Sequence, residues 1–119
     1  MQLELPRTRR YPFVASIELI ELQSEAQIKE QTSDLSLFGC HVITAKPLPL
    51  GTTVWLKITH QGAIFKATGR VANVRPTIGM GIVFTKVEEK DQLVLEKWIE
   101  LVSRSEMAVA HRTALLRPK

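Results

Sequence analysis

The chain has 119 residues, of which 45% are hydrophobic and 24% are charged, and its formal net charge is +4. This balance is typical of one globular domain, and no apolar run approaches the roughly 20 residues needed to span a bilayer. The first residues lack the basic and apolar regions of a signal peptide. Because Cys40 is the single cysteine, an internal disulfide is excluded and a reducing compartment is favoured. We therefore expect a cytoplasmic protein without membrane insertion.

Positive charge is concentrated at the two ends of the chain. Prolines at positions 6 and 12 oppose a helix, so residues 1–12 are expected to form a flexible basic arm. The arginines of this arm are Arg7, Arg9 and Arg10. Such an arm attracts anions, whether a nucleic acid, an acidic membrane surface or a phosphorylated small molecule.

Short segments along the body of the chain have the alternating or fully apolar patterns of β-strands. They cover residues 13–22, 26–32, 35–45, 52–59, 63–74 and 80–84. Gly69 interrupts the pattern of its segment and predicts a β-bulge. Short strands joined by tight turns predict a mainly β fold, a small six-stranded antiparallel barrel rather than a parallel sheet.

After Glu88 the hydrophobic period changes to that of a helix. The apolar stripe of this predicted helix consists of Val94, Leu95, Trp98, Leu101 and Val102. We expect the helix to pack on the barrel and to complete one domain over residues 13–103. Residues 104–119 form a C-terminal tail. Within it, residues 107–116 are apolar enough for another short helix, and a disordered tail is the alternative.

The residue types offer little for catalysis. His41, His60 and His111 are expected in three different settings, without the spacing of a zinc site. Cys40 and His41 are adjacent in a predicted strand, so their side chains point to opposite faces and do not form a nucleophile pair. The sequence contains no phosphate-binding loop and no dinucleotide fingerprint. We predict that the chain is not an enzyme and that it uses no cofactor.

One polar interruption lies at the start of the third apolar segment, where residues 34–39 read Asp-Leu-Ser-Leu-Phe-Gly. In an extended chain Asp34 and Ser36 point to the same face, and Gly39 permits a bend or the close approach of a ligand. A structural interpretation is a strand entry with an Asx turn, a hydroxyl contact and a bulge. A functional interpretation is a site for a phosphorylated guanine ligand, in which the carboxylate accepts guanine N–H groups and the arm's arginines bind phosphate. The residue chemistry alone does not single out this ligand.

The order of these features resembles the PilZ domain family, a bacterial receptor module for cyclic di-GMP, over residues 7–103. The family carries an Arg-x-x-x-Arg segment before its first strand and an Asp/Asn-x-Ser-x-x-Gly segment at a later one. The second segment is intact here. In the first, Arg9 matches the leading arginine and Phe13 stands at the second. Arg10 and, more weakly, Arg7 are candidates to compensate, while Phe13 either stacks on a base or is the first core residue of the first strand.

The resemblance also implies a PilZ-like split barrel and roles for individual residues. Arg9 is expected to contact phosphate or guanine, and Asp34 and Ser36 are expected to contact guanine. Gly39 is expected to let the ligand approach the backbone closely. With Arg10 as an auxiliary contact, these residues make up the expected cyclic di-GMP site.

Two functions follow from the resemblance. The first is a cyclic di-GMP receptor or adaptor that changes conformation at its arginine arm and signals to an unidentified protein partner. The alternative is a degenerate PilZ module that binds no nucleotide and acts through protein–protein contact. Binding of a nucleic-acid polymer is less favoured, because few exposed aromatic residues are expected for base stacking, and Trp55 and Trp98 are explained by the core.

Overall fold

The structure, a computed structural model, describes residues 9–116, with side chains described as far as Ser105. Residues 1–8 of the expected arm, including Arg7, and residues 117–119 of the tail lie outside the described residues. The elements are β1 (Tyr11–Pro12), β2 (Ser16–Glu21), β3 (Gln27–Leu35), β4 (Gly39–Ile43), β5 (Thr53–His60), β6 (Ala63–Arg75), β7 (Gly79–Lys86) and α1 (Glu89–Leu116).

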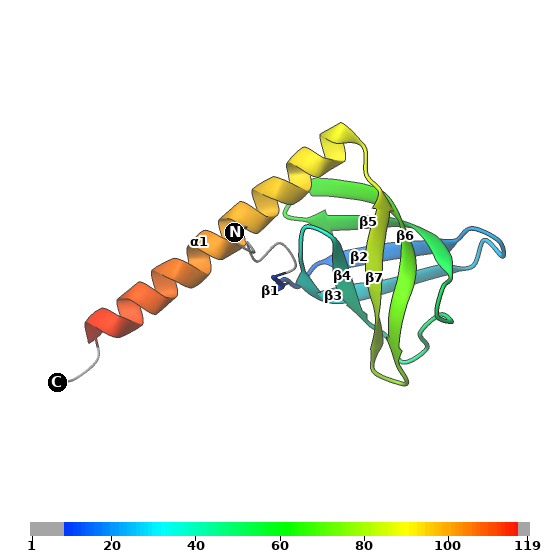
Figure 1. Ribbon diagram of the computed structural model, residues 1–119, viewed down its shortest axis with the longest axis horizontal. Coiled ribbons are helices and arrows are strands. Elements are labelled where there is room, and N and C mark those ends of the chain that lie inside the picture. Colours follow the sequence, from blue (N-terminus) through cyan, green and yellow to red (C-terminus); the bar gives the residue numbers. More distant parts are fainter. Residues whose placement is uncertain (1–8, 117–119) are drawn as a thin grey trace, which may run out of the picture.

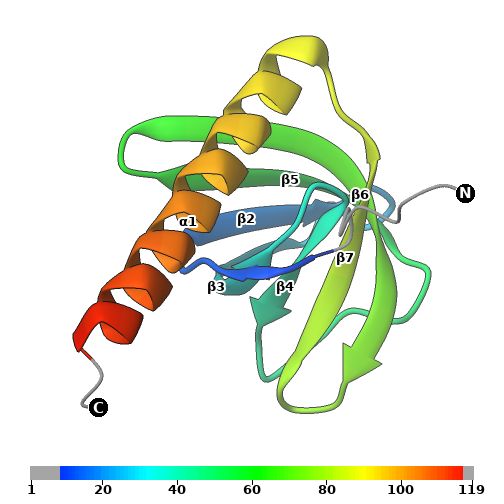
Figure 2. The same ribbon diagram turned by 60° about the vertical axis from the view of Figure 1, so that its left-hand side comes forward.

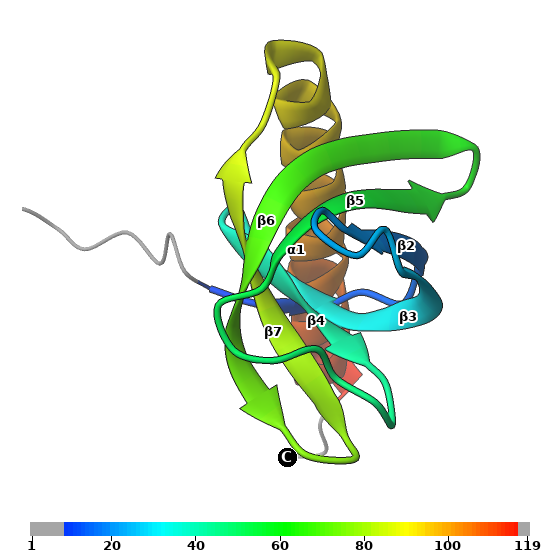
Figure 3. The same cartoon turned by 90° about the vertical axis from the view of Figure 1, so that its right-hand side faces the viewer.

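Six of the strands close into an antiparallel barrel (Figure 1). Going round it, the order is β3-β2-β5-β6-β7-β4, and β4 pairs back onto β3. The short β1 is an extra strand that pairs with the end of β3. Figure 3 shows β5 and β6 curving over one side of the barrel, with α1 behind them. The expected six-stranded antiparallel barrel with a C-terminal helix is confirmed.

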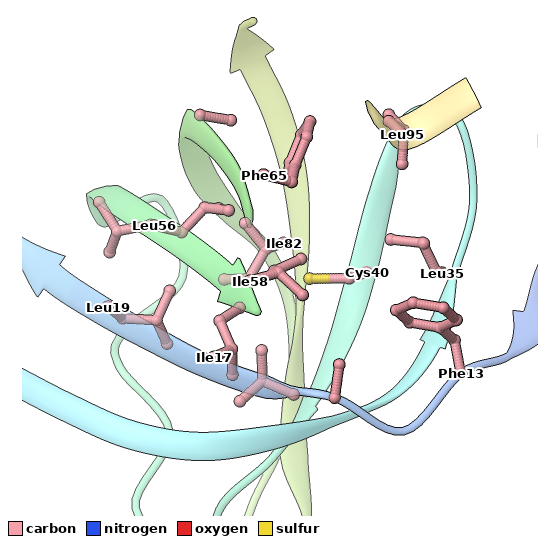
Figure 4. Packing of buried hydrophobic residues seen from close by; sticks show 14 of the residues in the cluster. Phe13, Ile17, Leu19, Leu35, Cys40, Leu56, Ile58, Phe65, Ile82 and Leu95 are labelled. Atoms are coloured by element: carbon pink, nitrogen blue, oxygen red, sulfur yellow. The ribbon is translucent and has the colours of Figure 1, made fainter. Parts of the chain in front are cut away.

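The core follows the alternation of the strands. In β5, Val54, Leu56 and Ile58 are buried while the residues between them face outward. Figure 4 shows Leu56 and Ile58 pointing into the barrel toward Ile17, Leu19 and Ile82 of the neighbouring strands. Trp98 is buried as expected, but Trp55 lies half-buried on the outer face of β5, so the core interpretation of Trp55 was wrong.

The register of β6 against β7 shifts between Thr68 and Gly69, which confirms the predicted bulge. The strand expected over residues 13–22 corresponds to β2, which is shorter and begins at Ser16. Residues 13–15 instead run beside β3, with the Phe13 N–H donating to the Ser33 carbonyl oxygen at 3.1 Å.

Helix α1 closes one side of the barrel and packs against β6 and β1. The buried carboxylate of Asp91 accepts the Lys66 N–H at 2.9 Å, which fixes the first turn of the helix on β6. Leu95 and Trp98 are buried as expected, but Leu101 is 47% exposed, so its place in the buried stripe was wrong. Since no proline or glycine interrupts residues 89–116, the expected second helix is the continuation of α1.

Candidate functional site

The N-terminal segment is attached to the end of β3. In the pairing of β1 with β3, Tyr11 lies opposite Leu35 and Pro12 opposite Asp34. The segment after β1 is held by the buried Thr32, whose hydroxyl donates to the Phe13 carbonyl at 2.6 Å and accepts the Ala15 N–H at 3.0 Å. Figure 2 shows β1 running alongside β3 beneath the helix. Backbone pairing therefore brings the arginine segment to the Asp-x-Ser-x-x-Gly segment.

This attachment places Arg10 against Asp34. The Arg10 Nη1 donates to the Asp34 Oδ1 at 2.8 Å, and the two side chains are 45% and 30% exposed. The guanidinium carbon of Arg9 lies 5.0 Å from the centre of the Tyr11 ring, a cation–π contact. Two of the expected site residues, Arg10 and Asp34, thus meet directly at the surface.

Ser36 lies in the turn between β3 and β4. Its hydroxyl accepts the N–H groups of Phe38 and Gly39, each at 3.1 Å, and lies 3.3 Å from the Gly39 carbonyl. The side chain is almost completely buried. The expectation of one continuous strand over residues 35–45, with Asp34 and Ser36 on the same face, was therefore wrong. The serine ends the extended chain because its hydroxyl accepts hydrogen bonds from two nearby backbone N–H groups.

Gly39 begins β4 and lies against β7. A Cβ at this position would overlap the carbonyl oxygen of Ile82, which belongs to β7. In the register of β4 and β7, Gly39 pairs with Val83. The glycine therefore permits the close approach of a neighbouring strand, and this contact explains the residue type without a ligand.

Phe13 is a core residue. Its ring lies 4.5 Å from His60 and 5.2 Å from Trp98, measured between ring centroids, and the residue is 4% exposed. Figure 4 shows the ring pointing inward beside Leu35. The core role is confirmed, and the ring is not presented to a base at the surface.

His41, which the sequence alone did not single out, belongs to the same site. It pairs with Asp34 across β3 and β4, and its Nδ1 lies 3.2 Å from the Ser33 Oγ. Its Nε2 is buried and has no hydrogen-bond partner among the described residues. Burial lowers the pKa of His41, the Asp34 carboxylate opposes this shift, and the positive charges of Arg75 and Arg10 add to it. Strand alternation could have revealed this position in the sequence, because Cys40 and Val42 point inward and His41, which lies between them, therefore points outward.

The adjacent Cys40 is inert. It is fully buried, and burial raises the pKa of its thiol to about 12, with the Asp34 carboxylate contributing. A thiol with such a pKa is almost entirely protonated at neutral pH and is a poor nucleophile.

The described part of the chain offers no group of three or more histidine, cysteine or carboxylate residues that could hold a metal ion. Within the same residues, no helix is long and apolar enough to cross a membrane. Positive charge accompanies the Asp34 carboxylate, since Arg10 contacts it and Arg75 lies close enough to act on the neighbouring His41. The arrangement suits an anionic ligand that also carries N–H donors for the carboxylate.

The family comparison settles which fold family this is. The family model of the PilZ domain matches residues 4–101. The chain belongs to the PilZ domain family. Its arm and its Asp-x-Ser-x-x-Gly turn both lie within the matched region, except for the first three residues of the arm.

Solved PilZ structures show the same fold at low sequence identity. The PilZ domain of YcgR from Escherichia coli, solved with c-di-GMP, has a TM-score of 0.69 and 18% identity, covering 87% of this chain and 95% of that one. The PilZ domain of CeSA from a cellulose synthesizing bacterium has a TM-score of 0.62 and 21% identity, covering 82% and 98%. PlzA of Borreliella burgdorferi, in complex with c-di-GMP, has a TM-score of 0.51 and 15% identity, covering 81% and 40%. The comparison with curated proteins gave no match.

Proposed function

We propose that this PilZ domain is a receptor for cyclic di-GMP that binds its ligand at the Arg10–Asp34 pair. The observation that carries the proposal is the 2.8 Å contact of these two side chains, since it joins the basic arm to the carboxylate of the second motif. Relatives with the same fold, YcgR and PlzA, were solved with c-di-GMP. The function is that of a receptor and adaptor, not of an enzyme, and Cys40, buried as a free thiol, fits a cytoplasmic location.

The energetics favour exchange of the ion pair for ligand contacts. An exposed pair such as Arg10–Asp34 is worth about 0–1 kcal/mol, because water and salt screen it. A hydrogen bond to a charged group contributes about 1.5–3 kcal/mol. A guanine nucleotide offers phosphate oxygens to Arg10 and N–H donors to Asp34, so both partners gain a stronger contact than the one they lose. Arg9, released from Tyr11, supplies the second guanidinium.

The attachment of Phe13 limits how far the arginine arm can move when the ligand binds. Its ring is held between His60 and Trp98, and Thr32 fixes its carbonyl. Ligand binding therefore reorients the residues before Phe13 and leaves the barrel unchanged. The reoriented arm forms the surface to which a protein partner binds.

A matched pair of arginine variants tests the proposal. Arg10→Ala removes an arginine at the site, and Arg104→Ala removes one that pairs with Glu100 on the helix surface at 3.1 Å. In a direct titration with cyclic di-GMP, Arg10→Ala should weaken binding by about 10- to 100-fold, the loss of one charge-assisted contact. Arg104→Ala should leave the affinity unchanged. Equal effects of the two variants would place the ligand elsewhere.

A nucleotide-free adaptor is the second candidate, and two observations favour it. The position of the second family arginine is occupied by the buried Phe13, and the hydroxyl of Ser36 is already engaged within its own turn. If this candidate holds, a pulldown recovers the same protein partner with and without cyclic di-GMP. A receptor instead recovers its partner in only one of the two conditions.

A further inference from the structure

The outer face of β2, β5 and β6 carries an aromatic side chain among cations. These three strands lie side by side in the barrel (Figure 3). Trp55 of β5 points outward and is half-buried, with Ile20 of β2 and Thr68 of β6 directly opposite it. The sequence disfavoured binding of a nucleic-acid polymer because Trp55 was expected in the core, and its position on the outer face removes that objection.

Basic side chains surround this tryptophan. Lys57 lies two residues along β5, and Lys66 and Arg70 are the diagonal neighbours of Trp55 on β6. Diagonal pairs in an antiparallel sheet are about 7–8 Å apart, which is within reach of long side chains. Lys86 extends the basic surface onto β7. Positive charge therefore lies around the indole on three adjacent strands.

Most of this positive charge is not compensated within the protein. The Lys57 Nζ lies 3.3 Å from the Glu18 Oε2. Among the side chains that the structure describes, no ion pair forms with Lys66, Arg70 or Lys86. Lys66 is also directly opposite Lys57 across β5 and β6, and like charges in such a pair repel each other. A bound anion would relieve this repulsion.

A single-stranded nucleic acid fits both features of this face. Its phosphates bind lysine and arginine while a base stacks on an aromatic side chain, a combination typical of proteins that bind single strands. The hydroxyls of Thr53, Thr59 and Thr68 on the same face are further donors for phosphate oxygens. A membrane surface fits less well, because Trp55 is half-buried within the sheet and does not project from a loop.

We propose that the outer face of β5 and β6 binds single-stranded nucleic acid, with one base stacked on Trp55 and phosphates held by Lys66 and Arg70. These two cations are four residues apart on β6, at most about 13 Å along the strand, so they contact phosphates on both sides of the stacked base. Recognition by charge and stacking depends little on base sequence and weakens as salt increases. The face is separate from the Arg10–Asp34 pair, which is held by β1 and β3.

The first test is a titration of the full chain with a thymidine oligomer of about 20 nucleotides, long enough to cover the face. The chain has two tryptophans, and Trp98 is only 5% exposed, so quenching of the emission reports on Trp55. We expect saturable quenching at about 50 mM salt that added salt reverses. If a labelled oligomer shows no change in anisotropy at high micromolar protein, the proposal is overturned.

The second test removes two cations of the face. The double variant Lys66→Gln/Arg70→Gln should bind the oligomer at least about tenfold more weakly. Its slope of log affinity against log salt should become shallower by about 1.4, since each lost phosphate contact contributes about 0.7. Lys46→Gln/Arg104→Gln removes the same charge from exposed positions outside the face and should change neither quantity. Equal effects of the two double variants would contradict the proposed surface.

The third test separates stacking from charge at Trp55. Trp55→Val removes the ring and should weaken binding of the labelled oligomer by about tenfold, whereas Trp55→Tyr keeps an aromatic ring and should retain most of the affinity. Unchanged affinity of Trp55→Val would exclude the stacked base. Co-sedimentation with phosphatidylserine vesicles is measured in parallel. Binding of the wild type to these vesicles and not to the oligomer would overturn the proposal in favour of a membrane surface.

Discussion

Arg10 and Asp34 are separated by 24 positions in the sequence, yet the Arg10 Nη1 and the Asp34 Oδ1 lie 2.8 Å apart. Pairing of β1 with β3 produces this contact, since Pro12 lies opposite Asp34 in the register. The contact connects the two segments that resemble the motifs of the PilZ family. It also shows that the carboxylate of this site already has a cationic partner, which a ligand must displace or share.

Phe13→Arg would rebuild the Arg-x-x-x-Arg pattern, but we expect it to destabilise the protein instead of improving binding. The side chain is 4% exposed and packs on His60 and Trp98, so the guanidinium would enter the core. The free energy of unfolding should fall by at least about 3 kcal/mol, as for other disruptive core changes.

Urea unfolding of this variant is best compared with Val14→Arg. Val14 is 62% exposed, and its substitution creates the same spacing from Arg10. We expect its stability to change by less than about 0.5 kcal/mol. A stable Phe13→Arg protein with tighter nucleotide binding would show that position 13 can turn outward to the ligand.

Gly39→Ala should destabilise the barrel at the β4–β7 contact. The added Cβ would overlap the Ile82 carbonyl oxygen, and backbone cannot yield as a flexible side chain does. We expect a loss of about 3 kcal/mol in the free energy of unfolding, at the upper end of overpacking costs. Gly62→Ala is the control, since its Cβ would meet nothing within 4 Å and only its φ of +83° opposes the change, at about 1 kcal/mol. A smaller loss for Gly39→Ala than for Gly62→Ala would refute the steric explanation.

The substitution Ser36→Ala distinguishes a structural role of the Ser36 hydroxyl from a role in ligand binding. Removal of the hydroxyl leaves the N–H groups of Phe38 and Gly39 without their acceptor, which should cost about 1–3 kcal/mol in unfolding free energy. Ser103→Ala, which removes an exposed hydroxyl bonded to the Glu100 carbonyl, should be nearly neutral. Thermal unfolding measures both. If Ser36→Ala leaves stability intact and abolishes nucleotide binding, the serine serves the ligand and not the turn.

The His41 imidazole should make stability depend on pH. Since burial lowers the pKa of His41 in the folded protein, the unfolded chain binds the proton more strongly. The stabilisation is therefore complete above the ordinary pKa of about 6.5, declines as the pH falls below that value, and is lost once the pH has fallen through the lower pKa of the folded protein. Unfolding free energies measured from neutral to mildly acidic pH should fall less steeply for His41→Asn than for the wild type. Identical slopes would mean that another group is responsible.

The barrel was predictable because its strands carry a clear period. In residues 52–59 Val54, Leu56 and Ile58 alternate with more polar residues, and these three are the ones that the structure buries, while Gly69 marked the bulge. The helix start was likewise evident from the change of period after Glu88, because hydrophobic spacing reports which face is buried.

The geometry of the candidate site was less predictable. Apolar residues run through residues 35–45, so hydrophobic pattern alone did not reveal the turn that Ser36 makes by binding two backbone N–H groups. Local side-chain hydrogen bonds of this kind leave no trace in periodicity. The exposure of Leu101 was missed for a related reason. A helical stripe indicates an apolar face, but not where along that face the barrel ends.

The central claim is that cyclic di-GMP binds at the Arg10–Asp34 pair, and calorimetric titration of the wild type and of Asp34→Ala tests it most directly. Asp34→Ala should change stability by at most about 1 kcal/mol, because the pair is exposed. We predict saturable binding to the wild type and an affinity at least about tenfold lower for Asp34→Ala, the loss of one charge-assisted contact. No heat with the wild type at high micromolar ligand, or equal affinity of the two proteins, would contradict the claim.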